Sequence, residues 1–280
     1  MLRTARLAAI LTCAALLAPS VASADVSISA AGSTALQPLV QAVADEYQSR
    51  NLDTKISITG GGSRTGLALV ASGSADIGDS DILASKEQTE GSEGKKALID
   101  HKVCAIGFSI VVHPDNGVKN LTKAQIQDIF AGKVKNWKDV GGKDLAITVI
   151  NRPSSSGTRA VFLKTLMGKT ELSRDTLVED ATGTVVQKIT QTPGTISYAA
   201  FSGTRGKAGI NEISIDGIAP TDANVETGKY PFWSYEHMYT SGPPSKDVSR
   251  FLAYLVSNST LVHKLGYILS RDIQKPENDR

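Results

Sequence analysis

The sequence is poor in cysteine, with two in 280 residues. Cys13 lies in an apolar N-terminal stretch, and Cys104 lies in a run rich in Val and Ile. Without the N-terminal stretch, Cys104 would be the only cysteine, so no intramolecular disulfide could form even in an oxidising compartment. We therefore expect Cys104 to be a buried thiol in a strand, a common environment for a free cysteine.

Net charge and long apolar runs are also absent after residue 24. No later run approaches the roughly 20 apolar residues that a transmembrane helix requires. The chain has 30 basic and 28 acidic residues, and two of the basic residues, Arg3 and Arg6, precede residue 25. The remaining 28 basic residues balance the 28 acidic ones. This balance argues against nucleic acid or an anionic membrane as the natural partner.

The N-terminal residues have the pattern of a secretory signal peptide. The two arginines precede the apolar stretch Leu7–Leu17, and Ala22–Ala24 forms an A-x-A cleavage site. We predict a cleaved signal peptide over residues 1–24 and an exported chain. A lipid anchor on Cys13 is the less favoured alternative, because Thr12 is a poor match to the small residue usual before a lipidated cysteine.

Short apolar runs rich in Val and Ile alternate with helical patterns along the rest of the chain. This alternation is typical of α/β architecture with open sheets. The run Val103–Val112 and the later stretch 231–240 (PFWSYEHMYT) are the segments best suited to connect two lobes. We therefore predict one discontinuous lobe, 25–112 with 232–280, and a second lobe, 113–231.

Three strand-to-helix junctions share a composition of small residues and hydroxyls. They are AGSTAL (Ala31–Leu36), GGGSRTGL (Gly60–Leu67) and SSSGTRA (Ser154–Ala160). Free backbone N–H groups at the positive end of a helix suit an anion. In open α/β sheets such junctions lie at the carboxyl ends of the strands, where ligands bind. Arg152, just before the third junction, can donate to two oxygens of an anion at once.

Each junction taken alone also has an ordinary structural interpretation. A Gly-rich turn is commoner than an anion cradle, and Arg152 could pair with a surface acid. Thr34 and Gln37 have the spacing of a capping box for a helix that begins near Ser33 or Thr34. The second junction is not a P-loop, because no lysine follows at the required spacing. The repetition of one arrangement at three equivalent places favours an oxyanion site.

Five segments resemble the phosphate-binding proteins of bacterial phosphate ABC transporters, and the resemblance spans nearly the whole chain after residue 24. The segments are AGSTALQPL (31–39), GGGSRTGL (60–67), ADIGDSD (75–81), LTKAQIQDIFAGKVKNWKDVGG (121–142) and RPSSSGTRAVF (152–162). The resemblance implies a type II periplasmic binding protein fold, in which two α/β lobes joined by two hinge strands close over dehydrated phosphate. It also implies a periplasmic, monomeric, non-enzymatic protein without metal or cofactor that delivers inorganic phosphate to membrane permease subunits.

The resemblance further implies which residues bind phosphate. Carried over by position, they are Thr34, the Ala35 amide, Ser63, Asp81, Arg152, Ser156, Gly157 and Thr158. Ser33 is a further candidate because of its place in the first junction. Two positions depart from the family pattern. Arg64 stands where a small residue is usual, which predicts a second positive charge near the cleft mouth. Ser154 stands where relatives often carry an acid that orients the arginine, so the partner of Arg152 is left open.

A carboxylate such as Asp81 would make an anion site selective. Phosphate still carries a proton at pH 7, and a carboxylate can accept a hydrogen bond from it. Sulfate and molybdate carry no proton at this pH, so they would meet Asp81 with repulsion alone. Both are therefore disfavoured, whereas arsenate, which does carry a proton, stays open as a ligand.

A secreted serine hydrolase is the alternative from another class of function. Ser156 would be the nucleophile, with His101, His113, His237 or His263 as its base. The sequence has no G-x-S-x-G elbow, and its four histidines lack the spacing of metal ligands. We therefore favour a binding protein over an enzyme.

Overall fold

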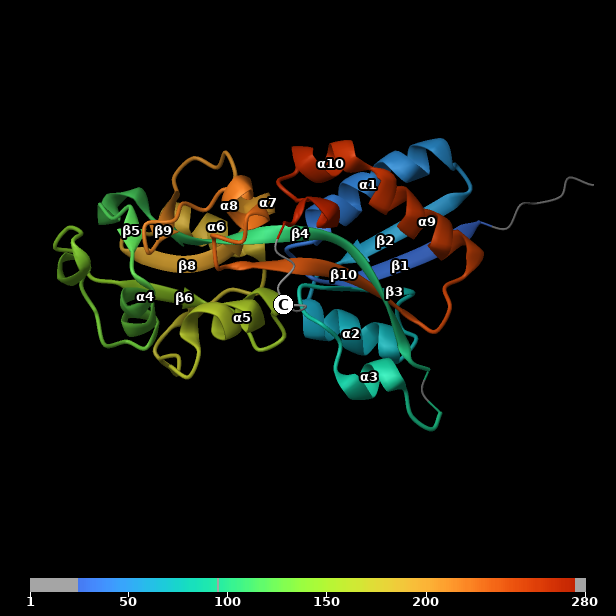
Figure 1. Ribbon diagram of the computed structural model, residues 1–280, viewed down its shortest axis with the longest axis horizontal. Coiled ribbons are helices and arrows are strands. Elements are labelled where there is room, and N and C mark those ends of the chain that lie inside the picture. Colours follow the sequence, from blue (N-terminus) through green and yellow to red (C-terminus); the bar gives the residue numbers. More distant parts are fainter. Residues whose placement is uncertain (1–24, 95, 275–280) are drawn as a thin grey trace, which may run out of the picture.

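The computed structural model describes residues 25–94 and 96–274, so the predicted signal peptide lies outside the described residues. Figure 1 shows two α/β lobes side by side, each with helices on both faces of its strands, and two long strands that run between them. This arrangement confirms the predicted architecture of two lobes joined by two strands. None of the described helices combines the length and the apolar character that crossing a bilayer demands.

The first lobe is built from both ends of the described chain. Its elements are β1 (Val26–Gly32), α1 (Gln37–Arg50), β2 (Thr54–Thr59), α2 (Ser63–Ala71), β3 (Ile77–Ser80), α3 (Lys86–Glu90), α9 (Lys246–Ser257) and α10 (Ser259–Lys264). The three strands are parallel, with β1 between β2 and β3. Helix α1 buries Leu39, Val40 and Val43, which recur at helical spacing. Parallel strands covered on both faces place the loops that follow them at one edge of the sheet.

The second lobe is formed by the middle of the chain. Its elements are β5 (Asn120–Leu121), α4 (Lys123–Phe130), β6 (Thr148–Asn151), α5 (Gly157–Phe162), β7 (Leu177–Val178), α6 (Thr182–Gln191), β8 (Thr195–Ala200), α7 (Phe201–Thr204), β9 (Asn211–Ile215) and α8 (Asp222–Glu226). Its core is aromatic, because the rings of Phe162 and Tyr198 stack with centroids 4.2 Å apart and Phe130 packs against both. This packing fixes α5, and with it the third junction, against the sheet.

Two antiparallel strands connect the lobes, β4 (Leu98–Val112) and β10 (Trp233–Ser241) (Figure 1). They lie between β3 and β8 in a sheet of order β2-β1-β3-β10-β4-β8-β6-β7. Strand β4 begins at Leu98 rather than at the predicted Val103, because its first residues pair with the end of β10. Cys104 is confirmed as a buried thiol on β4. The lobe boundaries after residue 112 and before residue 232 stay a prediction.

The segment NWKDVGG, residues 136–142, stabilises the second lobe. Trp137 is fully buried, and its indole Nε1 donates a hydrogen bond to the Gly194 carbonyl at 2.9 Å. Gly142 packs so closely on Asn116 that an added Cβ would lie 2.6 Å from the Asn116 carbonyl oxygen. The segment therefore ties the loop after α4 to the start of β8, away from the cleft.

The first junction differs from the prediction at its helix start. Helix α1 begins at Gln37, so the capping box of Thr34 with Gln37 is wrong. Ser33 takes the capping role, because its Oγ accepts hydrogen bonds from the amides of Ala35 at 3.1 Å and Leu36 at 3.0 Å. The Thr34 hydroxyl is instead bonded to the second lobe.

Candidate functional site

The three junctions meet where the two lobes close on each other. The first and second follow β1 and β2 in one lobe, and the third follows β6 in the other. Arg152 Nη2 donates to Thr34 Oγ1 at 3.1 Å, and Arg64 N donates to the Ser155 carbonyl at 3.1 Å. These contacts join the first and second junctions to the third. The structure therefore assembles the predicted cleft from strand ends, as the fold class requires.

Asp81, just after β3, is the most firmly held side chain of the cleft. It is 1% exposed, and its Oδ1 accepts a hydrogen bond from Ser33 Oγ. Its Oδ2 accepts one from Thr158 Oγ1 of the other lobe at 2.8 Å. Its backbone is fixed too, because its amide donates to Ser63 Oγ at 2.9 Å and its carbonyl accepts from Ser234 Oγ at 2.6 Å. Both oxygens of Asp81 therefore accept a hydrogen bond from a hydroxyl, one from each lobe.

Arg152 crosses the cleft from the end of β6. Its Nη2 donates to Thr34 Oγ1 and, at 2.9 Å, to the Asp180 carbonyl. Its own amide donates to Asn151 Oδ1 at 2.8 Å. A hydroxyl and a carbonyl therefore orient the guanidinium, whereas Ser154 is exposed. The structure thus identifies the hydrogen-bond partners of Arg152, which the sequence leaves open.

The guanidinium of Arg152 is not saturated by these contacts. Its Nε and Nη1 atoms are buried without a hydrogen-bond partner among the described residues. Burial lowers the pKa of Arg152, while Tyr198, Asp81 and Asp180 act in the opposite direction. An arginine nevertheless stays charged at neutral pH. A buried cation with two unused donor atoms calls for an anionic acceptor.

The third junction brings α5 directly against the first lobe. Ser156 caps the helix, because its Oγ accepts from the Arg159 amide at 3.2 Å. Gly157 lies so close that an added Cβ would overlap Ser63 Oγ and lie 3.0 Å from Asp81 Cβ. Only a residue without a side chain fits between the lobes here.

All nine predicted site residues are buried along this lobe contact. They are Ser33, Thr34, Ala35, Ser63, Asp81, Arg152, Ser156, Gly157 and Thr158. Their contact with phosphate stays a prediction. The Ala35 amide, a predicted phosphate donor, donates to Ser33 Oγ in this structure. Arg64 is exposed at the cleft edge.

The sequence reasoning missed the start of α6. The Thr182 amide donates to Thr34 Oγ1 at 3.3 Å, and the Thr182 hydroxyl is buried without a partner among the described residues. Thr34 and Thr182 both line a cavity of about 800 Å³ between α1 and α6. The small and hydroxyl residues of ATGT (181–184) before a helix resemble the three junctions and could have revealed this one.

The geometry does not favour the serine hydrolase. The nucleophile candidate Ser156 caps its own helix. The four histidines are engaged elsewhere: His101 with Thr240, His113 with Asp115, His237 with Asp100 and His263 with Asp272. A hydrolase needs a base within hydrogen-bond reach of the nucleophile.

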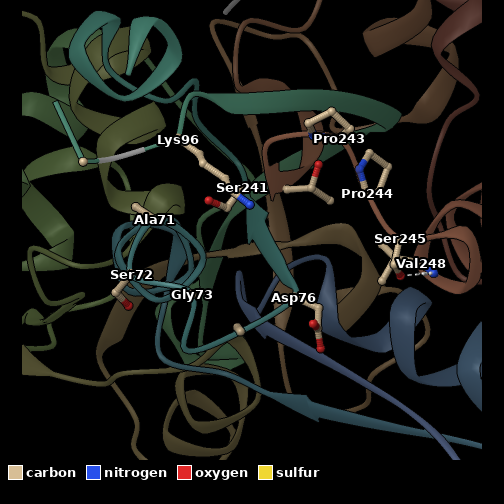
Figure 2. A pocket seen from close by; sticks show the side chains of 13 residues that line it. Ala71, Ser72, Gly73, Asp76, Lys96, Ser241, Pro243, Pro244, Ser245 and Val248 are labelled. Carbon is tan, nitrogen blue, oxygen red and sulfur yellow. Dashed lines mark hydrogen bonds between the residues drawn. The ribbon is translucent and has the colours of Figure 1, made fainter. Parts of the chain in front are cut away.

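A separate surface pocket of about 370 Å³ lies between the end of α2 and the start of α9 (Figure 2). Asp76 and Lys96 on its wall are both exposed. Asp76 already accepts hydrogen bonds from the amide and hydroxyl of Ser29, each at 2.8 Å. No predicted site residue lines this pocket, which lacks the buried charge of the cleft.

Comparison with known proteins agrees with this geometry. The sequence profile described as the PBP superfamily domain matches residues 18–259. The phosphate-binding protein PstS of Bacillus subtilis (strain 168) is 43% identical over 251 residues, which cover 89% of this chain and 82% of that protein.

Solved structures give the same result. A putative phosphate ABC transporter substrate-binding protein from Clostridium perfringens, with bound phosphate, has a TM-score of 0.80 and 27% identity. The match covers 87% of this chain and 99% of that one. An ABC-type phosphate transport receptor from Vibrio cholerae has a TM-score of 0.68 and 26% identity over 86% of this chain and 99% of its own. The chain therefore belongs to the PBP superfamily and, within it, to the phosphate-binding proteins of bacterial phosphate ABC transporters.

Proposed function

We propose that this protein binds inorganic phosphate between its two lobes and delivers it to the permease of an ABC transporter. Like the other members of its family, it is a binding protein and not an enzyme. One observation carries the proposal: the buried guanidinium of Arg152 keeps two unpaired donor atoms within electrostatic reach of the buried carboxylate of Asp81. A protonated oxyanion satisfies both groups at once, because it offers acceptors to Arg152 and a donor to Asp81.

The division of donors and acceptor explains how phosphate would be held. Arg152 supplies the full positive charge and two N–H groups to phosphate oxygens. The hydroxyls of Ser33 and Thr158 donate to Asp81 in this structure and would border the bound phosphate. Asp81 accepts the remaining phosphate proton. The other predicted residues contribute amides and hydroxyls from the three junctions.

Several finer statements belong to the same proposal. The nine predicted residues form the phosphate site, and residues 1–24 direct export to the periplasm and are removed. The mature chain acts as a monomer with the lobe boundaries predicted above. The burial of all nine residues along the lobe contact supports their assignment, and the two connecting strands in Figure 1 support the lobe boundaries.

Calorimetric titration of the mature protein with phosphate, arsenate and sulfate tests the proposal. A ligand of five heavy atoms, at about 1.5 kcal/mol each, has a ceiling of about 7.5 kcal/mol, which corresponds to a dissociation constant of a few micromolar. We expect phosphate binding in this range or tighter, arsenate competition, and much weaker sulfate binding. Millimolar phosphate binding would contradict the transport function.

Phosphate should also hold the lobes together. In this structure the lobes already contact each other through Arg152, Thr34 and Thr158. Without phosphate, the unsatisfied guanidinium favours an opened cleft in which water reaches it. Small-angle scattering should therefore show a smaller radius of gyration with phosphate than without it. Identical profiles with confirmed binding would indicate a rigid, preformed pocket.

A further inference from the structure

Two buried carboxyl groups lie behind the candidate site and have no part in the function proposed above. Asp79 lies on β3 and is 1% exposed, and Glu236 lies on the hinge strand β10 and is 0% exposed. None of their four carboxyl oxygens has a hydrogen-bond donor among the described residues. The register of β10 shifts directly after Glu236, at a bulge in the hinge. Buried polar groups without partners at such a place require an explanation.

The groups around Glu236 come from three other segments. Asp79 and Asp81 belong to β3 and the residue after it, and the pairing of His237 with Ser80 places Glu236 next to Asp81. Cys104 lies opposite on β4, and Tyr267 follows α10. Burial, and then Asp81, raise the pKa of Glu236 well above its usual range, with a smaller contribution from Asp79. Burial and then Glu236 likewise raise the pKa of Cys104. These neighbours are acidic or neutral.

The cations and the histidine nearest in sequence point elsewhere. His237, the next residue of β10, bonds Asp100 at 2.9 Å. Lys102 of β4 is exposed and lies over the Tyr235 ring at 4.1 Å. An ionised Glu236 would therefore be a buried negative charge beside Asp81 and without a counter-ion among the described residues, which is strongly unfavourable.

Only one of two adjacent buried carboxyl groups ionises readily, and the hydrogen bonds decide which. Ser33 Oγ already accepts from two amides, so its own proton is directed to Asp81. Asp81 thus accepts hydroxyl hydrogen bonds on both oxygens, whereas Glu236 accepts none. These hydrogen bonds favour the proton of the pair on Glu236.

We propose that Glu236 is a neutral carboxylic acid that donates a hydrogen bond to Asp81, keeps Asp81 ionised and thereby determines selectivity for phosphate over sulfate. This inference rests on the proposed function. If the proton moved from Glu236 to Asp81, Asp81 would become a donor and could bond a sulfate oxygen. The hinge residue thus acts on the anion only through Asp81, as a positioning residue.

Three variants test this role. Glu236→Gln keeps a neutral side chain with an N–H donor, and Glu236→Leu removes the donor at similar size. Met238→Leu, two residues further along β10 and equally buried, controls for altered packing of the hinge strand. Each protein is titrated calorimetrically with phosphate and with sulfate between pH 5 and pH 8, with thermal unfolding as a check of folding.

The pH profile of sulfate binding is the decisive measurement. Sulfate offers no proton to Asp81, so wild-type sulfate binding should be weak at pH 8 and should strengthen as the pH falls. Glu236→Gln and Met238→Leu should keep the wild-type profile and ratio of phosphate to sulfate affinity. Glu236→Leu should lower that ratio at least about tenfold and shift the onset of sulfate binding to higher pH.

Several results would overturn the inference. A higher phosphate preference in Glu236→Gln would mean that Glu236 is ionised in the wild type. A wild-type ratio and pH profile in folded Glu236→Leu would mean that Glu236 does not act on Asp81. If Glu236→Leu does not fold, the test rests on Glu236→Gln alone. An altered pH profile of sulfate binding in that variant would contradict a neutral donor at Glu236.

An infrared measurement separates this inference from the proposed function. A protonated buried carboxyl gives a carbonyl absorption that an ionised one lacks, and we expect part of this absorption to disappear in Glu236→Gln at pH 7. This result needs no ligand. Failure of wild-type protein to bind phosphate would contradict the proposed function, whereas an unchanged infrared spectrum would contradict the neutral acid.

Discussion

The two lobes contribute opposite groups to the cleft, and they differ in how far those groups are satisfied. On the first lobe, both oxygens of Asp81 accept hydrogen bonds. On the second lobe, Arg152 keeps two buried donor atoms without a partner among the described residues. The closed cleft therefore needs an acceptor more than a donor. An anion would supply acceptors to Arg152 on the second lobe, and it would also have to be compatible with the carboxylate of Asp81 on the first lobe.

Because of this difference, we expect the affinity for anions and the selectivity among them to depend on different lobes. The charge of Arg152 attracts any oxyanion, because a guanidinium does not distinguish phosphate from sulfate by protonation. In the proposed site, Asp81 would admit only an oxyanion that still carries a proton. Substitutions on the second lobe should therefore mainly change how tightly anions bind, and substitutions around Asp81 should mainly change which anion binds.

Removal of the second lobe's charge should have the largest effect. Arg152→Met leaves bound phosphate beside Asp81 with no cation, and losing one partner of a buried pair costs about 3–5 kcal/mol, a loss of about 10²- to 4 × 10³-fold in affinity. Arg152→Lys keeps the charge but loses the planar two-point contact, so we expect at least about a tenfold loss. Calorimetric titration with phosphate measures both. An unchanged titration curve for the Lys variant would place Arg152 outside the site.

A substitution that only obstructs the contact between the lobes should have the second-largest effect. In Gly157→Ala the added Cβ would overlap Ser63 Oγ across the cleft. Overpacking of about 1–3 kcal/mol should lower phosphate affinity about 5- to 150-fold while each lobe stays folded. Gly183→Ala on α6 is the matched control, because no atom lies within 4 Å of its added Cβ. Equal affinities of the two variants would show that binding does not require this contact.

The charge of Asp81 should affect selectivity more than phosphate affinity. Asp81→Asn removes the negative charge and adds an N–H group that sulfate can accept, while the amide oxygen can still take the phosphate proton. We expect the ratio of phosphate to sulfate affinity to fall at least about tenfold, mostly through a gain for sulfate. Competition titrations on both proteins measure this ratio. A ratio that survives the substitution would remove Asp81 from the selectivity mechanism.

The sequence could predict the groups that line the contact between the lobes, because strand-to-helix junctions are local. Hydroxyls, glycines and Arg152 stand within a few residues of a predicted helix start, and the fold class brings such starts to one edge of a sheet. The first junction shows the limit of local reasoning. Thr34 has the spacing of a cap, yet its hydroxyl bonds Arg152, more than a hundred residues away, and Ser33 caps the helix instead.

The buried carboxyl groups behind the proposed phosphate site could not be predicted, because their burial depends on long-range strand pairing. Glu236 reads as an ordinary residue of a strand whose pattern does not indicate burial. It becomes fully buried because β10 returns to lie between β3 and β4. Asp79, in the turn-like segment ADIGDSD, is buried by the same pairing. The hydrophobic pattern of neither segment indicates which strand will pair with it.

The smallest effect should come from the second arginine, Arg64, at the cleft edge. Its backbone amide bonds the other lobe, but its side chain is exposed. Exposed charges at a rim are screened by salt over about 8 Å at physiological ionic strength, so they steer an ion more than they hold it. We expect Arg64→Ala to change phosphate affinity by less than about threefold at 0.15 M salt and to slow association mainly at low salt. Stopped-flow association rates across ionic strength measure this effect, with Arg64→Lys as the charge-preserving control. A loss above about tenfold at 0.15 M salt would mean that the first lobe also supplies a cation to bound phosphate, and the division between the lobes would fail.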